Sequence, residues 1–397
     1  MEAYAKLDVT RASLLVSSLR GGVLHNAHGS SAVGCSASST LGNAMKSRNG
    51  RPVITSPVPR AVWESLIEAD PDAVVTQSLA WHDAVFADGR YKDVSRLYEF
   101  PCGRQVVLPL ARRRRRPAWT TVTASWPRAW GVCGPISSGG QITAEEAASV
   151  LADLAGQGAL VAEVQLRYGA SEAWLSEARQ YQIEEQGCHV LDLAGGFNRV
   201  WTHRFRSAAR TAVRKAERSG VEVEVDTSGQ LLPVFYDLYE KSMLRWAAMQ
   251  HEPLWLTRWR TIRATPPKML AAVSEHFGKD CGIWVARSEG VPVAAIIVIQ
   301  SGTHAKYWRG AMDKELATPV RANEFLHSLA IEQACRDGHR CYEMGQSRPG
   351  SPLAAFKEKL GATTQSGHTL RAERIPLQAF TRASRNAAKK VIGFRDV

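Results

Sequence analysis

The segment from Ile283 to Gly361 constrains the fold more than any other part of the chain. It begins with two apolar runs, Ile283–Arg287 and Val291–Ile299, which are separated by Ser-Glu-Gly at 288–290. Two runs rich in β-branched residues, joined by a short polar turn, are typical of a β-hairpin. A third run, Ala305–Ala311, contains aromatic residues and is also predicted to be a strand.

A helix is predicted after Pro319. Apolar residues recur there at the i, i+3 and i+4 spacing of an amphipathic helix, and Gly338 stands where a helix C′ residue is expected. The next segment, Cys341–Gly345, has the composition of a short strand.

A second helix is predicted between Ser351, which is a favourable N-cap, and Gly361. Pro352 would occupy the first helical position, where proline is well tolerated. With a further strand predicted at Thr369–Ile375, the order is β-β-β-α-β-α-β. Strands joined through helices indicate an α/β sheet with at least one parallel pair.

Lys357 stands at the edge of the apolar face of this second helix. At about 100° per residue, Leu353, Phe356 and Leu360 share one face, and Lys357 lies beside them. Two interpretations remain open. The side chain can lay its stem along the apolar surface with the ammonium group in water, or it can hold its charge against a surface of low dielectric constant. Periodicity alone favours the first.

The order of these motifs resembles the second domain of the Fem-like branch of the GNAT-fold acyltransferases. The matching motifs are the strands PVAAIIV and AKYWRGA, the strand G-x-R-x-Y-E-M-G and the helix F-K-x-K-L-G. The resemblance extends from about Val58 to about Ile375 and rests on the order of the motifs. It implies that Phe356 and Lys357 lie at the reaction centre, where Lys357 would stabilise an oxyanion.

The resemblance also implies an α/β fold of two tandem GNAT-like β/α domains with mixed sheets. Residues 58–198 would form the first domain and residues 199–375 the second, with the C-terminal segment 376–397 returning to the first. Residues 1–57 are rich in Ser, Ala and Gly, a composition that favours a disordered tail. An upstream start codon, with Met45 as the alternative start, is also favoured, and a transit-like peptide is the third interpretation.

Residues 205–220 are predicted to form a helix with a basic ridge. Arginine recurs at every fourth position from 206 to 218, which spans about 18 Å of helix. The opposite stripe is apolar and comprises Phe205, Ala208, Ala209, Ala212, Val213 and Ala216. The ridge is either a solvated face or a phosphate-binding surface. The family pattern R-x-x-x-[RK]-K-A-x-x-x-G-V matches at Arg210, Arg214 and Lys215, which makes these three residues candidates for binding a nucleotide or tRNA.

Five consecutive arginines at 112–116 allow the same two interpretations, a phosphate contact or a solvated hairpin loop. The sequence favours the loop. The formal net charge of +12 favours an anionic partner, whether nucleic acid, nucleotide or anionic membrane surface.

Seven cysteines without a C-x-x-C pair argue against a disulfide framework or a metal site and indicate reduced thiols in the cytoplasm. No apolar run approaches the roughly 18 residues that span a bilayer. The oligomeric state is not predicted.

The sequence contains no conventional nucleophile motif G-x-S-x-G, no zinc-binding motif H-E-x-x-H and no phosphate-binding loop G-x-x-x-x-G-K-[ST]. The pyrophosphate-binding pattern [QR]-x-x-G-x-[GA] before a helix is also missing; the partial match at Arg287–Pro292 spans a hairpin turn. This counts against acetyl-CoA as donor. The Fem-like resemblance implies aminoacyl-tRNA as co-substrate, with no bound cofactor.

The leading hypothesis is an aminoacyl-tRNA-dependent aminoacyltransferase that forms an amide bond with an amine. The acceptor would be a small molecule of secondary metabolism or a peptidoglycan precursor. A CoA-dependent GNAT N-acyltransferase and a basic RNA-binding module with a degenerate site are the alternatives. Tyr307 and Arg309, on a central strand, are candidate substrate-binding residues. Glu343 and Glu324 are weak candidates for the general base.

Overall fold

The structure is a computed structural model that describes residues 51–114, 120–127, 129–138, 141–170, 172–378 and residue 394. The predictions for residues 1–50, for Arg115 and Arg116, and for nearly all of 376–397 lie outside the described residues. Within the described ranges, no helix is long and apolar enough to cross a membrane.

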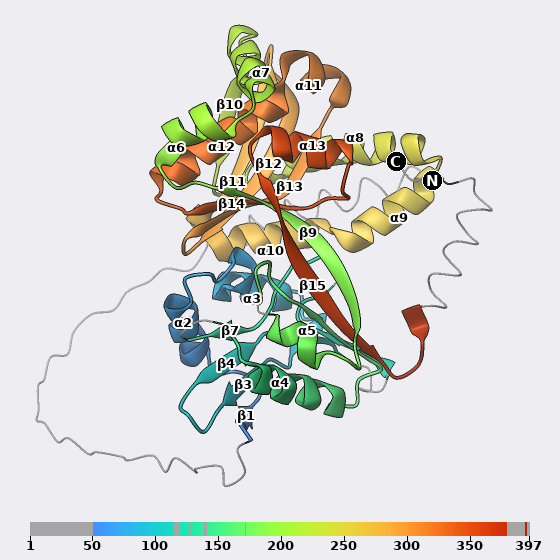
Figure 1. The fold of residues 1–397 in the computed structure, drawn as a ribbon. Helices are drawn as coiled ribbons and strands as arrows, with labels where there is room; N and C mark the ends of the chain where they lie inside the picture. Colours follow the sequence, from blue (N-terminus) through green and yellow to red (C-terminus); the bar gives the residue numbers. More distant parts are fainter. Residues whose placement is uncertain are drawn as a thin grey trace, which may run out of the picture. The chain divides into compact units, whose positions relative to one another are not determined.

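Two sheets hold the strands (Figure 1). The larger is eleven-stranded, in the order β10 (Glu222–Asp226), β11 (Cys281–Ser288), β12 (Val291–Ser301), β13 (His304–Met312), β14 (Cys341–Gln346), β9 (Gln182–Asp192), β15 (Thr363–Glu373), β8 (Val161–Gln165), β6 (Val122–Ala124), β5 (Ala111–Arg113) and β2 (Tyr91–Asp93). The smaller sheet has the order β1 (Val53–Thr55), β3 (Arg96–Glu99), β4 (Gln105–Leu108) and β7 (Ile136–Ser137).

The larger sheet is mixed, as predicted, because β13 pairs with β14 and β6 with β8 in parallel while the other neighbours are antiparallel. Two long antiparallel strands, β9 and β15, lie side by side at its centre and connect the earlier strands of the chain to the later ones (Figure 1). β15 begins at Thr363, six residues before the predicted strand, because its first residues pair with β9. The division into domains at residues 198 and 199 stays a prediction.

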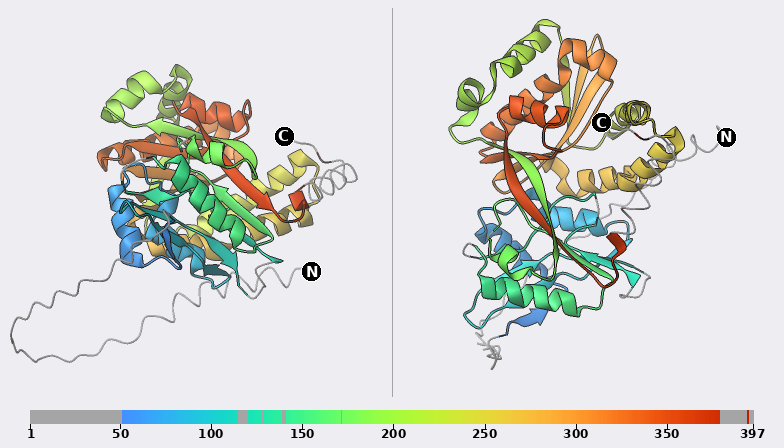
Figure 2. Two further views of the ribbon diagram at one scale, coloured as in Figure 1. Left: turned by 60° about the horizontal axis from the view of Figure 1, so that its bottom comes forward. Right: turned by 45° about the vertical axis from the view of Figure 1, so that its right-hand side comes forward.

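Helices cover both faces of the later strands (Figure 2). In chain order the helices are α2 (Arg60–Ala69), α3 (Leu79–Phe86), α4 (Ala144–Gly156), α5 (Ala173–Glu177), α6 (Gly196–Arg199), α7 (Ser207–Arg218), α8 (Leu232–Gln250), α9 (Leu254–Ala264), α10 (Pro267–Phe277), α11 (Lys314–Val320), α12 (Ala322–Arg336) and α13 (Pro352–Lys359). A π-helical turn, η3 (Val200–Arg204), precedes α7, and 3-10 turns lie at Val75–Gln77 and Gly278–Asp280.

The predicted order of elements in the constraining segment is confirmed except for one additional helix, α11, which contains Pro319 and precedes the predicted helix α12. β11 and β12 form the hairpin, and the two residues of its turn, Glu289 and Gly290, have φ of 52° and 77°. Positive φ at both central positions is the geometry that tight hairpins favour. Ser351 caps α13 by accepting a hydrogen bond from the amide of Ala354, with Pro352 at the first position.

The prediction that residues 1–57 form a disordered tail is wrong in part. Val53–Thr55, within the segment 1–57 predicted to be a disordered tail, form β1 and pair with residues 97–99 of β3. Val53 and Ile54 are exposed. This short strand adds to an existing sheet edge through backbone hydrogen bonds, so composition gave no sign of it.

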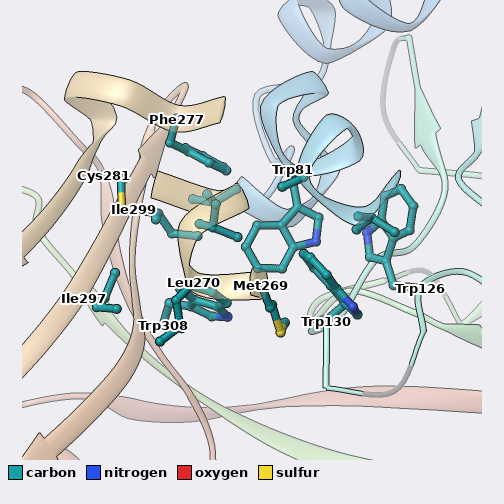
Figure 3. Packing of buried hydrophobic residues seen from close by; sticks show 14 of the residues in the cluster. Trp81, Trp126, Trp130, Met269, Leu270, Phe277, Cys281, Ile297, Ile299 and Trp308 are labelled. Carbon is teal, nitrogen blue, oxygen red and sulfur yellow. The ribbon is translucent and has the colours of Figure 1, made fainter. Parts of the chain in front are cut away.

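The core beneath β13 is built by residues from distant parts of the chain (Figure 3). The ring of Trp81, on α3, lies 5.5 Å from Trp130 and 5.5 Å from Trp308 on β13. It also lies 6.1 Å from Phe277 at the end of α10. Each pair meets edge to face, the arrangement that the charge distribution of aromatic rings favours. The position of β13 therefore depends on the first half of the chain as well as the second.

Gly361, directly after α13, allows a close backbone contact with η3. Its φ is +84°, and a Cβ atom there would lie 2.6 Å from the carbonyl oxygen of Arg204. The amide of Arg206 donates to the carbonyl of Lys359 at 3.0 Å. The start of α7 is thereby held against the end of α13.

We expect Gly361→Ala to destabilise the protein more than Gly338→Ala. Gly338, after α12, has a similar φ of +79°, but no atom lies within 4 Å of the position its Cβ would take. The Gly338 variant should therefore lose only the conformational cost of about 1–2 kcal/mol. The Gly361 variant should lose about 2–5 kcal/mol, because a backbone clash is added. Urea unfolding of both variants measures the difference. Equal losses in the free energy of unfolding would show that Gly361 makes no close contact with the backbone of η3.

Candidate functional site

The larger sheet divides between β13 and β14. These parallel strands pair only between His304–Lys306 and Cys341–Glu343. Beyond that point β13 continues to Met312 beside β12, and β14 continues to Gln346 beside β9. The pairing of β12 and β13 skips Trp308, which indicates a β-bulge beside the division. We call the place where the two strands part the fork.

Lys357 of α13 points to the fork. Its Nζ donates hydrogen bonds to the carbonyl oxygens of Gly345 and Gln346, each at 3.0 Å. The residue is 2% exposed. The interpretation that keeps this ammonium group in water is therefore wrong. Because an ammonium group has three N–H donors, one donor remains beyond these two hydrogen bonds.

Gly345 makes this arrangement possible. Successive carbonyls of a regular strand point in opposite directions, yet those of Gly345 and Gln346 accept from one nitrogen. Gly345 has φ of +70°, and the register between β14 and β9 shifts at this point. A glycine in the left-handed region turns the strand locally, as in glycine-containing bulges.

The surroundings of Lys357 lower its pKa. Burial is the main cause and brings the pKa of Lys357 from 10.5 to about 8. The nearby ammonium of Lys306 also lowers the pKa, whereas Cys188 and the carboxylate of Glu343 oppose the shift. The amine can therefore change its protonation state close to neutral pH.

Glu343 is already engaged at the fork. Its carboxylate accepts a hydrogen bond from the ammonium of Lys306, and both side chains are buried. The thiol of Cys188 lies 3.6 Å from the same Glu343 oxygen. The other weak candidate for a base, Glu324 on α12, pairs with Lys359 at 2.7 Å. Neither carboxylate contacts Lys357 directly.

Phe356 and Tyr307 meet at His327 of α12. The His327 ring lies 4.6 Å from the Tyr307 ring and 5.3 Å from the Phe356 ring. Burial, with the charge of Lys357 as a second cause, lowers the pKa of His327 to about 3. This histidine is therefore neutral at neutral pH. The structure thus brings together three of the predicted site residues, Lys357, Phe356 and Tyr307, around His327, which was not predicted to be a site residue.

Arg309 lies apart from this group. Its guanidinium donates to the carbonyls of Trp308 at 3.0 Å and Ala129 at 2.9 Å, and stands 4.9 Å from the centre of the Trp308 ring. Burial lowers the pKa of Arg309. Among the described residues, no carboxylate forms an ion pair with it. Arg309 is thus a half-buried cation held by carbonyl groups, on the side of β13 that faces the Trp81 core.

The basic ridge is confirmed in part. Arg210 donates through Nη1 to the carbonyls of Trp201, Thr202 and Phe205, so it caps the end of η3. Arg214 and Lys215 are exposed, and the Arg214 guanidinium lies 5.8 Å from the Trp201 ring.

The predicted apolar stripe of α7 needs one correction. Ala208 is exposed, while Phe205, Ala209, Ala212, Val213 and Ala216 are buried. The helix begins only at Ser207, and its register on α12 leaves Ala208 outside. Arg206, at the N-cap, lies 3.9 Å from Glu358, which places the ridge next to α13.

Residues 203–358, which include α7, the fork and most of α13, match the family model described as an acetyltransferase (GNAT) domain. No curated protein sequence matches the chain. Among solved structures, FemX superposes with a TM-score of 0.58 at 11% identity, covering 80% of this chain and 96% of that chain. A conserved protein of unknown function from Bacteroides thetaiotaomicron gives a TM-score of 0.51 at 9% identity, covering 80% and 98%. L-PGS from Bacillus licheniformis gives 0.49 at 13% identity, covering 85% and 98%.

These likenesses concern the fold. They confirm the resemblance to Fem-like proteins and the predicted α/β architecture of GNAT-like modules with mixed sheets.

We expect the lowered pKa of Lys357 to be measurable by NMR. In protein labelled at the lysine side chains, one Cε resonance should titrate near pH 8 and be missing from Lys357→Met. Because the unfolded chain binds this proton more tightly, wild-type stability relative to Lys357→Met should rise between pH 8 and 10.5. A Lys357 resonance that titrates at the ordinary value, with no such rise, would place the amine in water.

Proposed function

For this acyltransferase of the GNAT fold, we propose that the donor is an aminoacyl-tRNA and that the product is an amide. The acceptor is an amine of a small molecule or of a peptidoglycan precursor. The observation that carries the proposal is the buried ammonium of Lys357, fixed at the fork by two carbonyls beside Phe356. The Phe-Lys pair is also the feature on which the resemblance to Fem-like enzymes places the reaction.

The proposed reaction needs no covalent enzyme intermediate. The amine nitrogen attacks the carbonyl carbon of the aminoacyl ester and forms a tetrahedral oxyanion. The bond from that carbon to the ribose oxygen then breaks, the C–N bond remains, and the amine proton ends on the ribose hydroxyl. The remaining N–H donor of Lys357 would bind the oxyanion, and a donor in a dry site acts more strongly than one in water.

The geometry around Lys357 suits this role. Its two carbonyl contacts fix the nitrogen in place before substrate arrives, so little reorganisation accompanies the reaction. At 2% exposure the ammonium is closed off from solvent, and the substrate must displace neighbouring groups to reach it. Lys357 is not suited to be the general base while it is protonated, and the amine must give its proton to another group or to water.

Recognition of the donor would fall to the exposed part of the α7 ridge. Arg214 and Lys215 face solvent, and the ridge adjoins α13 through Arg206 and Glu358. Cations in a row suit the repeated phosphates of RNA. The chain has no [QR]-x-x-G-x-[GA] cradle for the pyrophosphate of CoA, which favours tRNA over CoA. The description of the matched domain as an acetyltransferase keeps CoA-dependent N-acyl transfer as the second candidate.

Loss of the Lys357 ammonium should slow turnover strongly. We expect Lys357→Met to fold and to lose about 10²–10³ in kcat, the loss typical of removing one oxyanion donor. Because only the protonated amine carries the charge, wild-type kcat should fall as the pH rises above about 8, the pKa of Lys357. A wild-type rate that instead rises through this pH would make the neutral amine a base and contradict the assignment.

The exposed ridge should carry part of the salt dependence of tRNA binding. Arg214→Ala with Lys215→Ala should weaken binding of charged tRNA and reduce the slope of log K against log salt by about 1.5, the value for two phosphate contacts. Lys279→Ala with Lys314→Ala removes the same charge from exposed positions off α7 and is the matched control. Equal slopes in both double variants would show that the ridge is only a solvated face.

A further inference from the structure

Helix α9 presents its apolar side to solvent. Trp255, Trp259 and Ile262 are 70%, 57% and 47% exposed, and the helical period places them on one side. The buried positions of the same helix are instead Thr257 and Thr261. A surface helix of a soluble protein normally buries its apolar stripe and exposes its polar one, so α9 has the reverse pattern.

Contacts on the buried side of α9 hold the helix in this orientation. α9 packs against α8 (Figure 2). The hydroxyl of Thr257 donates to the carboxylate of Glu252 at 2.6 Å, which satisfies the polar group that is buried. Turning α9 about its axis would expose this bond and bury arginines, so the Trp face is a stable feature of the fold.

Arginines border the exposed face. At 100° per residue, Arg258 and Arg263 lie on its two sides. The guanidinium of Arg263 lies 5.3 Å from the centre of the Trp259 ring, while Arg258 pairs with Glu240 at 2.6 Å. Residues 254–264 contain no Asp or Glu. The face is therefore apolar in the middle, with the guanidinium of Arg263 at one edge and the Arg258–Glu240 ion pair at the other.

We propose that this face of α9 binds the surface of an anionic phospholipid bilayer, with the helix lying in the plane of the interface. Tryptophan side chains favour the boundary between the lipid headgroups and the acyl chains, because the ring is apolar and the N–H is polar. Arg263 at one edge of the face would contact lipid phosphates. An apolar face bordered by arginine is the composition of helices that lie on membranes rather than cross them.

The same features disfavour other occupants. RNA is disfavoured because Ile262, which belongs to the exposed face, has no aromatic ring on which a base could stack. A second copy of the face would bring like charges together. The chain segments 1–50 and 379–397, of which the structure describes only residue 394, each contain more Lys and Arg than Asp and Glu, so they do not complement the face either. The inference stands apart from the choice of acyl donor.

Vesicle co-sedimentation of the full chain tests the inference. We expect binding to vesicles of equal parts phosphatidylglycerol and phosphatidylcholine, weaker binding in high salt, and little binding to phosphatidylcholine alone. Trp255→Ser with Trp259→Ser should reduce the partition coefficient by about tenfold or more. Trp255→Phe with Trp259→Phe should retain most of it. Ile183→Ser, at an exposed apolar residue of β9, is the matched control and should bind as the wild type does.

Arg263→Glu, a single exposed substitution, provides a second test should the double serine variant fold poorly, and it should weaken binding to the anionic vesicles. Absence of vesicle binding at low salt, or equal binding by wild type and these variants, would overturn the inference. Loss of charged-tRNA affinity in the serine variant without vesicle binding would instead assign the face to RNA. Loss of a dimer in sedimentation velocity would assign it to a second copy.

Discussion

The candidate site depends on the parting of two parallel strands. β13 and β14 share only three residue pairs, and the last of these joins Lys306 to Glu343, whose side chains form a buried ion pair. Beyond it, the carbonyls of Gly345 and Gln346 accept from Lys357. A buried ammonium group is costly unless it is hydrogen-bonded, so the fork and α13 stabilise one another. Displacing either would leave a charge or two carbonyls unsatisfied.

The position of the fork is set from both ends of the chain. Trp308, at the bulge of β13, packs on Trp81 of α3, and β14 is bordered by β9, which in turn pairs with β15. The surfaces proposed for anionic partners, the ridge of α7 and the outer face of α9, lie on helices around this sheet. The ridge adjoins the site through Arg206 and Glu358. A single structural centre thus positions the proposed chemistry, while exposed helices supply the proposed contacts.

Helices and strands could be predicted from local sequence signals. Contacts between residues far apart in the chain could not. Ser351, Pro352 and Gly361 bound α13 as predicted, because caps act within one turn of the chain. The burial of Lys357 could not be derived from periodicity, since it depends on carbonyls of another strand. Arg210 was assigned to the exposed ridge, but it caps η3, a π-helical turn that sequence did not indicate. The contact between His327 and Phe356 joins α12 to α13, so neither helix alone could have predicted it.

The identity of the donor is the central claim, and a direct titration tests it. Purified protein would be titrated with charged bulk tRNA and, separately, with acetyl-CoA. The account predicts saturable binding of the charged tRNA and none of acetyl-CoA, because the exposed cations of α7 suit a polyphosphate chain and the sequence has no pyrophosphate cradle. Saturable binding of acetyl-CoA alone would contradict it and make the chain a CoA-dependent N-acyltransferase.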